Sequence, residues 1–216
     1  KKDEAILKEL QKLIKESKKI RFEGNGYGDE WIKEAEKRGL SNLKDTPRAL
    51  AVMKDKKTIE LFNELGVLSP IEMEARHEIE LENYILKLQI EARILGDLSL
   101  NHILPSAIKY QNTLIANIKG MVDIFGATAK KMAATQYQIL EETSTHINEL
   151  KNNCDLMLVE RKKANKFEHA EEKAFAYCDK VKPYFQKIKY HSDKLELLID
   201  DEFWPLPKLR EILFTK

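Results

Sequence analysis

The sequence predicts an all-α protein, a multi-helix bundle with long antiparallel helices and no substantial sheet. Its 216 residues contain only eight Gly and six Pro, and the stretch between Gly126 and Pro183 contains neither. That stretch is rich in Ala, Leu, Lys, Glu and Gln, which favour helix. Alternating β-branched and aromatic residues are absent, apart from one short possible edge strand at residues 20–22.

The charges of the chain almost cancel. Its 37 Lys and Arg residues oppose 36 Asp and Glu residues, which leaves a formal net charge of +1. A balanced chain has no overall field to attract nucleic acid or an anionic membrane, so we expect neither partner. Hydrophobic residues make up 43% and charged residues 34%, which excludes a disordered linker.

Cysteine usage and apolar runs bear on location. Cys154 and Cys178 are the only thiols, and they form no C-x-x-C motif. This usage predicts a reducing, cytoplasmic environment. No apolar run approaches the roughly 20 residues of a membrane-spanning helix. Because the sequence starts at Lys1 rather than Met, close to a helical pattern, we expect a fragment of a longer protein.

Residues 1–70 are expected to form a short-helix N-terminal segment that packs on the same domain as the rest. A Gly-rich turn at 24–28 separates its first two helices, because Gly adopts positive φ angles at little steric cost. Asp29 is expected to cap the second helix and Gly39 to end it. We predict helices ending near residue 19, spanning 30–38, starting at 46–47, and running from 55 to 65.

Residues 71–216 are expected to form a long-helix bundle with a C-terminal Trp-Pro strap. The first long helix spans 71–104, with Gly96 as a weak point and Pro105 as a kink or stop. The next, at 127–158, carries a heptad seam of apolar and some polar residues at alternating spacings of three and four, which favours packing within the bundle over a dimeric coiled coil. Helices at 167–181 and 184–199 follow, divided by Pro183, and the strap at 203–207 leads into 208–214. The seam residues are Gln136, Leu140, Thr143, Ile147, Leu150, Cys154 and Met157.

Charge is unevenly spread along the chain. Residues 60–100 carry nine acids and three bases, whereas residues 151–190 carry ten bases and six acids. The two blocks either face each other within the bundle or form solvated faces. The basic cluster at 161–163 is one helical turn, too short for a nucleic-acid stripe.

One pattern is typical of a metal site. Glu74 and His77 form an E-x-x-H at helical spacing, the half-motif of di-iron four-helix bundles. Such a site requires a second copy and two further inward Glu residues, and no second E-x-x-H occurs. A surface position on a helix is therefore the preferred interpretation, and a ferritin-like oxidase is a minor alternative.

The other candidate groups match no catalytic or ligand pattern. The loop at 24–28 reads G-x-G-x-G rather than the dinucleotide fingerprint, and favours a structural turn that exposes Tyr27 or packs Trp31. We therefore predict no catalytic, cofactor-binding or metal residue in this chain. The groups so discounted are His102, His146, His169, His191, Cys154, Cys178 and the acidic cluster Asp200, Asp201 and Glu202.

Several short sequence motifs, taken in order, resemble those of the C-terminal region of type III glutamine synthetases. They lie within residues 20–110 and in the last dozen residues, whereas the long helical segment between them matches only in character. One departure is Gly28, which stands where the family pattern has Ser. The motifs include RFEGNGY at 21–27, EAEKRGL at 34–40, EARHEI at 74–79, LENY at 81–84 and WPLPKLRE at 204–211.

The resemblance implies a structural and assembly domain of a larger enzyme. Members of that family are ATP-dependent glutamate-ammonia ligases, which make glutamine from glutamate, ammonia and ATP through γ-glutamyl phosphate and use divalent metals such as Mg²⁺. Their catalytic barrel would lie upstream of Lys1, so we expect the fragment alone to be inactive and to hold no cofactor. The implied partners are the catalytic domain of the same polypeptide and a homo-oligomer, a double-ringed dodecamer. Phe203, Trp204 and Leu206 would pack within the bundle or against those partners. The main alternative is a stand-alone helical interaction module that binds a partner helix.

Overall fold

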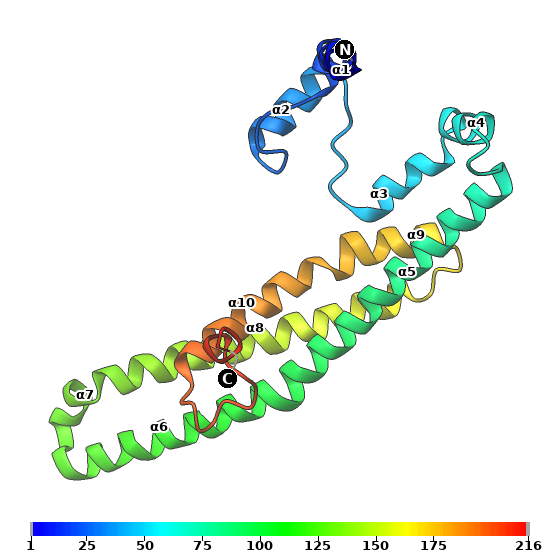
Figure 1. The fold of residues 1–216 in the computed structure, drawn as a ribbon. Helices are drawn as coiled ribbons and strands as arrows, with labels where there is room; N and C mark the ends of the chain where they lie inside the picture. Colours follow the sequence, from blue (N-terminus) through cyan, green and yellow to red (C-terminus); the bar gives the residue numbers. More distant parts are fainter. Residues whose placement is uncertain (1, 215–216) are drawn as a thin grey trace. The chain divides into compact units, whose positions relative to one another are not determined.

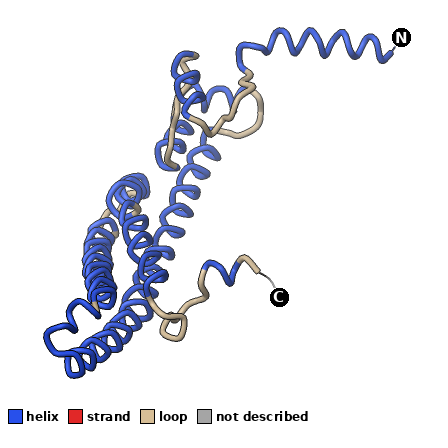
Figure 2. Tube along the Cα trace, turned by 90° about the vertical axis from the view of Figure 1, so that its left-hand side faces the viewer, coloured by secondary structure: helices blue, strands red, loops and turns tan. Residues whose placement is uncertain are grey.

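The computed structural model describes residues 2–214, and every regular element among them is a helix (Figure 1). The tube in Figure 2 likewise shows only helices and loops in this part, so the all-α prediction is confirmed. Residues 20–22 form no edge strand. Contacts divide the chain into two compact units, Lys1–Lys44 and Asp45–Lys216. The sequence predicts the division after residue 70 instead. In the structure, residues 45–70 belong by their contacts to the same unit as the long helices.

The first unit contains α1 (Lys2–Glu16), which continues into the 3-10 turn η1 (Ser17–Ile20), and α2 (Asp29–Lys37). Gly28 is the N-cap of α2, whereas Asp29 lies in its first turn, where a carboxylate favours the helix dipole. Asp29 was expected as the cap, and the extended backbone of Gly28 takes that place.

The Gly-rich loop of the first unit is a structural turn, as predicted. Asn25 Oδ1 accepts a hydrogen bond from the backbone N–H of Tyr27 at 3.0 Å, and the side chain of Tyr27 is fully exposed. Trp31 packs against Phe22, with ring centroids 4.8 Å apart. Arg38, the C-cap of α2, ties the end of η1 to this helix, because its guanidinium donates to the backbone carbonyl oxygens of residues 19 and 21.

The second unit begins with three short elements, α3 (Thr46–Ala51), η2 (Val52–Lys54) and α4 (Lys56–Glu64). Asp45 caps α3 by accepting from the backbone N–H of Arg48 at 3.0 Å. Gly66 follows α4 with a φ of +64°, a conformation that L side chains rarely adopt, so the helix ends here as the sequence predicts.

A long helical rod follows, made of α5 (Pro70–Asp97), the π-helical segment η3 (Leu98–Ile103) and α6 (Leu104–Phe125). Ser69 and Glu72 form a capping box that fixes its start. Of the two outcomes expected at Pro105, a kink or a stop, the stop is wrong, since the rod continues to Phe125. A proline ring clashes with the carbonyl four residues earlier, which here belongs to η3, where the wider π turn relieves the clash.

The chain then reverses through η4 (Gly126–Thr128) and α7 (Ala129–Met132) into α8 (Ala134–Ala164). This helix begins later than the expected residue 127, because the positive φ of Gly126 starts a tight reversal first. It also ends later than the expected residue 158, at Ala164. Its heptad seam is confirmed as the buried face. Thr143, Leu150, Cys154 and Met157 are fully buried, and Gln136, Leu140 and Ile147 are half-buried.

The third rod consists of α9 (Ala170–Ala176), the π-helical η5 (Tyr177–Val181) and α10 (Pro183–Leu198), and a short α11 (Leu209–Ile212) ends the described chain. Pro183 again follows a π-helical segment. Figure 1 shows α8 antiparallel to α6 on one side and to the α9–α10 rod on the other. Side chains from all three rods form one core, which includes Leu81, Ala107, Leu150, Tyr177, Ile188 and Leu195.

Replacing a core leucine tests this packing. Leu150 is fully buried on α8, so Leu150→Ala is expected to lower the free energy of unfolding by about 2–5 kcal/mol through lost burial and the cavity left behind. Leu156 lies on the same helix with 42% of its surface exposed, so Leu156→Ala should change it by only about 0.5 kcal/mol. Urea unfolding followed by circular dichroism measures both, and equal losses would contradict the assignment of the buried face.

Candidate functional site

A cavity of about 930 Å³ lies within the second unit, where α5 meets η2 and α9. Its apolar wall includes Met53, Met73, Leu81 and Phe175. Its polar wall brings together side chains that are distant in sequence: Lys54, Glu74, His77, Glu78, His169, Glu171 and Glu172. We call this space the His77 cavity.

Local helix signals place these groups. The capping box at Ser69 fixes the start of α5, and the spacing of three and four residues then puts Glu74, His77 and Glu78 on one face. His169 is the N-cap of α9, and Glu171 lies in its first turn, near the positive end of the helix dipole. The cavity therefore forms where two helix beginnings meet.

An ion pair closes one side of the His77 cavity. Lys54 Nζ lies 2.8 Å from Glu171 Oε2. The hydrogen bond from Lys54 lowers the pKa of the Glu171 carboxyl, and the same bond raises the pKa of the Lys54 ammonium. Both groups stay charged at neutral pH as a result, and each serves as the counter-ion of the other.

His77 is buried, with 6% of its surface exposed, and its Nε2 has no hydrogen-bond partner. Burial lowers the pKa of the imidazole, and the nearby Lys54 ammonium lowers it further. The ring is therefore neutral at pH 7. The surface interpretation of the E-x-x-H holds for Glu74, which is exposed, but not for His77. Among residues 2–214, no three His, Cys, Asp or Glu side chains are grouped so that they could hold a metal ion.

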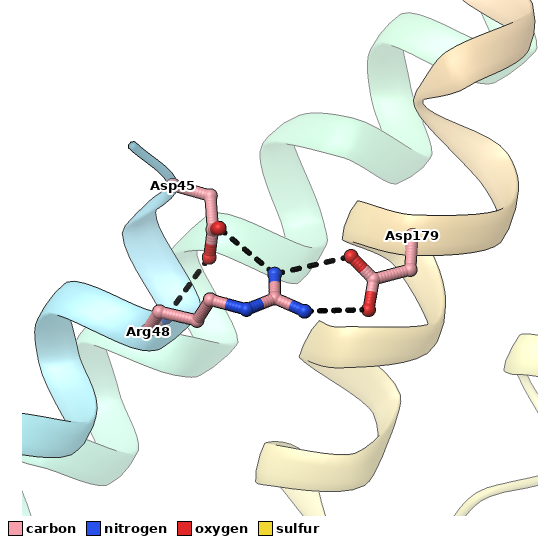
Figure 3. Close-up of polar contacts among 3 residues, drawn as sticks. All are labelled: Asp45, Arg48 and Asp179. Carbon is pink, nitrogen blue, oxygen red and sulfur yellow. Dashed lines mark hydrogen bonds and ion pairs between the residues drawn. The ribbon is translucent and has the colours of Figure 1, made fainter. Parts of the chain in front are cut away.

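Arg48 fastens α3 to the third rod (Figure 3). Its guanidinium donates two hydrogen bonds to the Asp179 carboxylate, at 3.1 and 3.0 Å, and a third to Asp45 Oδ2 at 2.8 Å. The bond from Arg48 holds the pKa of Asp179 below its usual range. With Lys54 and Glu171, this is how charge joins the short helices to α9 and η5. Both basic partners lie outside residues 60–100, for which the sequence left open either contact with residues 151–190 or a solvated face.

Two of the discounted histidines meet across the bundle. His146 on α8 and His191 on α10 have their Nδ1 atoms 2.9 Å apart. Burial and the neighbouring His191 lower the pKa of His146, which favours the neutral form of its ring, so that its Nδ1 can take part in a hydrogen bond as either donor or acceptor. No sequence spacing predicts this pair, because its members come from different helices. His102 is exposed.

The remaining candidates have structural surroundings. Cys154 is buried, and burial raises the pKa of its thiol, which favours the neutral form that the sequence predicts. Cys178 is a buried free thiol on η5. In the acidic cluster at 200–202, Asp201 pairs with Lys208 at 2.5 Å and also with Arg210. The basic cluster lies in the last turn of α8, where Lys163 pairs with Glu160 at 2.7 Å.

The C-terminal strap packs on its own bundle, one of the two positions that the sequence allows. Trp204 belongs to the core, and Phe203 stacks on Tyr110 of α6 with ring centroids 6.0 Å apart. Ser106 donates a hydrogen bond to the carbonyl oxygen of Phe203, which fixes the strap to the start of α6.

Large apolar side chains remain exposed along the long rod. We call Ile79, Leu86, Ile90 and Ile94 the α5 stripe, and Ile108, Ile115 and Val122 the α6 stripe. Members of each stripe recur at helical spacing, so each lies along one face of its helix. Part of the α5 stripe lines an apolar groove of about 460 Å³. Soluble proteins rarely leave large contiguous apolar patches exposed.

These features define the class of protein: an all-α bundle domain with a partly open cavity of mixed apolar and charged lining and with exposed apolar stripes. A model of the glutamine synthetase C-terminal domain matches residues 5–122, more than half of the chain. The chain belongs to this family, and the resemblance predicted from its sequence is confirmed.

Three relatives extend the comparison beyond residue 122. A glutamine synthetase of Bacteroides fragilis (strain YCH46) is 44% identical over 216 residues, 100% of this chain and 30% of that protein. A type-3 glutamine synthetase of Dictyostelium discoideum is 32% identical over 99% of this chain and 31% of that protein. A glutamine synthetase of Butyrivibrio fibrisolvens is 27% identical over 98% of the chain and 30% of that protein. The chain thus spans about a third of the length of these relatives. No helix within residues 2–214 is long and apolar enough to cross a membrane.

Loss of the Arg48 contact is expected to destabilise α3 locally. Arg48→Lys replaces a planar group that bridges two carboxylates with a single ammonium, so α3 should open more often while the rods stay intact. Hydrogen exchange is expected to accelerate for the amides of α3 and to remain unchanged for α8. Arg76→Lys, at an exposed position of α5, is the matched control. Unchanged exchange in α3 would show that the contact adds nothing.

Burial of His77 makes stability depend on pH. The pKa of His77 in the folded chain lies below the ordinary 6.5. Below about pH 6.5 the unfolded chain therefore binds more protons than the folded chain, and the free energy of unfolding falls as the pH falls. The urea midpoint should therefore drop between pH 7.5 and 5.5, and the drop should be smaller in His77→Gln. His146 contributes a fall of the same sign in both proteins. His102→Gln, an exposed change, should follow the parent, and an unaltered drop in His77→Gln would refute the prediction.

Proposed function

We propose that this chain is the structural and assembly domain of a type III glutamine synthetase, and that it performs no catalysis by itself. The observation that carries the proposal is the pair of exposed α5 and α6 stripes, which offer apolar surface along most of one rod. Membership of the C-terminal domain family supports it, as does the span of about 30% of each relative.

The proposed partners follow from that family. The stripes would pack against the catalytic region of the same polypeptide and against neighbouring subunits of a homo-oligomer, a dodecamer. The parent enzyme would be a cytoplasmic, ATP-dependent glutamate-ammonia ligase, and its ATP and Mg²⁺ would bind in the catalytic region rather than here. No nucleic acid or membrane partner is proposed, because the net charge of +1 provides no attraction for either.

Assembly tests this role. In a synthetase polypeptide that carries this chain as its C-terminal region, Ile90→Glu with Ile94→Glu should place charge in the proposed contact and give smaller particles in size-exclusion chromatography with light scattering. Leu197→Glu, at a 79% exposed position on α10 outside both stripes, should assemble normally. Normal assembly of the Ile90 and Ile94 variant would overturn this use of the α5 stripe.

A turnover assay tests the other half of the proposal. The 216-residue chain should produce no glutamine from glutamate, ammonia and ATP, whereas the full polypeptide should. Turnover by the chain alone would refute the proposal that it performs no catalysis by itself. If the native gene encoded only these residues, the stand-alone interaction module would be the better description.

A further inference from the structure

The His77 cavity is large enough for a small molecule or an inserted side chain. Its volume of about 930 Å³ lies within the range of about 300–1,000 Å³ that ligand sites occupy. It combines an apolar wall, including Met73 and Phe175, with a polar wall from three elements. The assembly role makes no use of it.

The charge of the polar wall is negative. Glu74, Glu78, Glu171 and Glu172 oppose one lysine, Lys54, which is already paired with Glu171. Within the described residues, no ion pair or hydrogen bond engages the other three carboxylates. A cleft lined by one sign of charge concentrates counter-ions, so this one attracts cations.

The buried histidine adds an acceptor to these carboxylates. His77 is 94% buried, lines the cavity, and leaves Nε2 without a partner. An unpaired buried polar atom is costly unless something binds it. In the neutral ring with the proton on Nδ1, Nε2 accepts a hydrogen bond. The carboxylates thus offer acceptors to a ligand directly, and Nε2 offers one once the ring turns toward the cavity, while the one ammonium of the wall is occupied.

We propose that the His77 cavity binds an organic cation with an apolar body, a primary ammonium or guanidinium group on a hydrocarbon chain. The cation would lie among Glu74, Glu78 and Glu172, and the His77 ring would turn toward the cavity so that Nε2, now closed off from solvent, accepts its hydrogen bond. The hydrocarbon would cover the apolar wall at Met73 and Phe175. A free amine and a Lys or Arg side chain from another protein segment share this chemistry.

The five histidines of the chain provide a direct readout. In an NMR titration with n-hexylammonium, the ring resonances of His77 and His169 should shift, because both line the cavity. Those of His102, His146 and His191 should stay in place. Hexanol should bind more weakly and hexanoate should not bind. Absence of shifts at tens of millimolar hexylammonium, or equal binding of hexanoate, would overturn the proposal.

Two exposed carboxylates allow substitutions that leave the core intact. Glu74→Gln and Glu172→Gln should each weaken hexylammonium binding by about two- to fivefold, and the double variant by about tenfold. Glu80→Gln, exposed on the same helix α5 but outside the cavity, is the matched control and should bind as the parent does. Identical hexylammonium affinity in the parent and all four variants would place binding elsewhere and refute the site.

A second ligand distinguishes the two sources of the cation. A blocked peptide with one lysine between leucines should shift the same two histidines if the cavity receives a side chain from another segment. Shifts with hexylammonium alone would assign the cavity to a small amine. Both outcomes retain the cation site, and a lack of shifts with either ligand would reject it.

Discussion

Burial of the seam on α8 is the constraint on which the second unit depends. Leu150, Cys154 and Met157 lie on one face of this helix and are inaccessible to solvent, and both other rods pack against it. Removing water from these side chains provides the main driving force, since the ion pairs that join the short helices to the third rod are partly exposed and each adds little. The positions of α6 and α10, and of the strap that covers α6, follow from this contact.

Most helices could be predicted because their signals are local. The capping box at Ser69, the break at Gly66 and the seam of α8 each depend on residues within a turn or two of one another. Pro105 was misread because local rules treat a proline as a stop, whereas the preceding π-helical segment lets the rod continue. A proline follows each π-helical segment by two residues, and η3 also packs against α8 and α10.

The candidate sites were less accessible to sequence reasoning. The E-x-x-H spacing correctly placed Glu74 and His77 on neighbouring turns of one helix, but nothing local indicated that α9 and η2 would cover His77. The contacts of Arg48 with Asp179 and of His146 with His191 join residues far apart in the chain. Such pairs follow from the folded arrangement of the rods, and only an alignment or a structure can reveal them.

The π-helical segments also bear on which insertions and deletions this fold tolerates. An α-helix turns about 100° per residue, and η3 fits its extra residue without breaking the rod. Loss of one residue within Leu98–Ile103 would restore ordinary winding but rotate everything after it by roughly that angle. Ala107, Leu114 and Ile118 would then turn away from α8, and the α6 stripe would turn with them. Insertions and deletions among homologues should therefore concentrate in the loops between helices and avoid the π-helical segments η3 and η5.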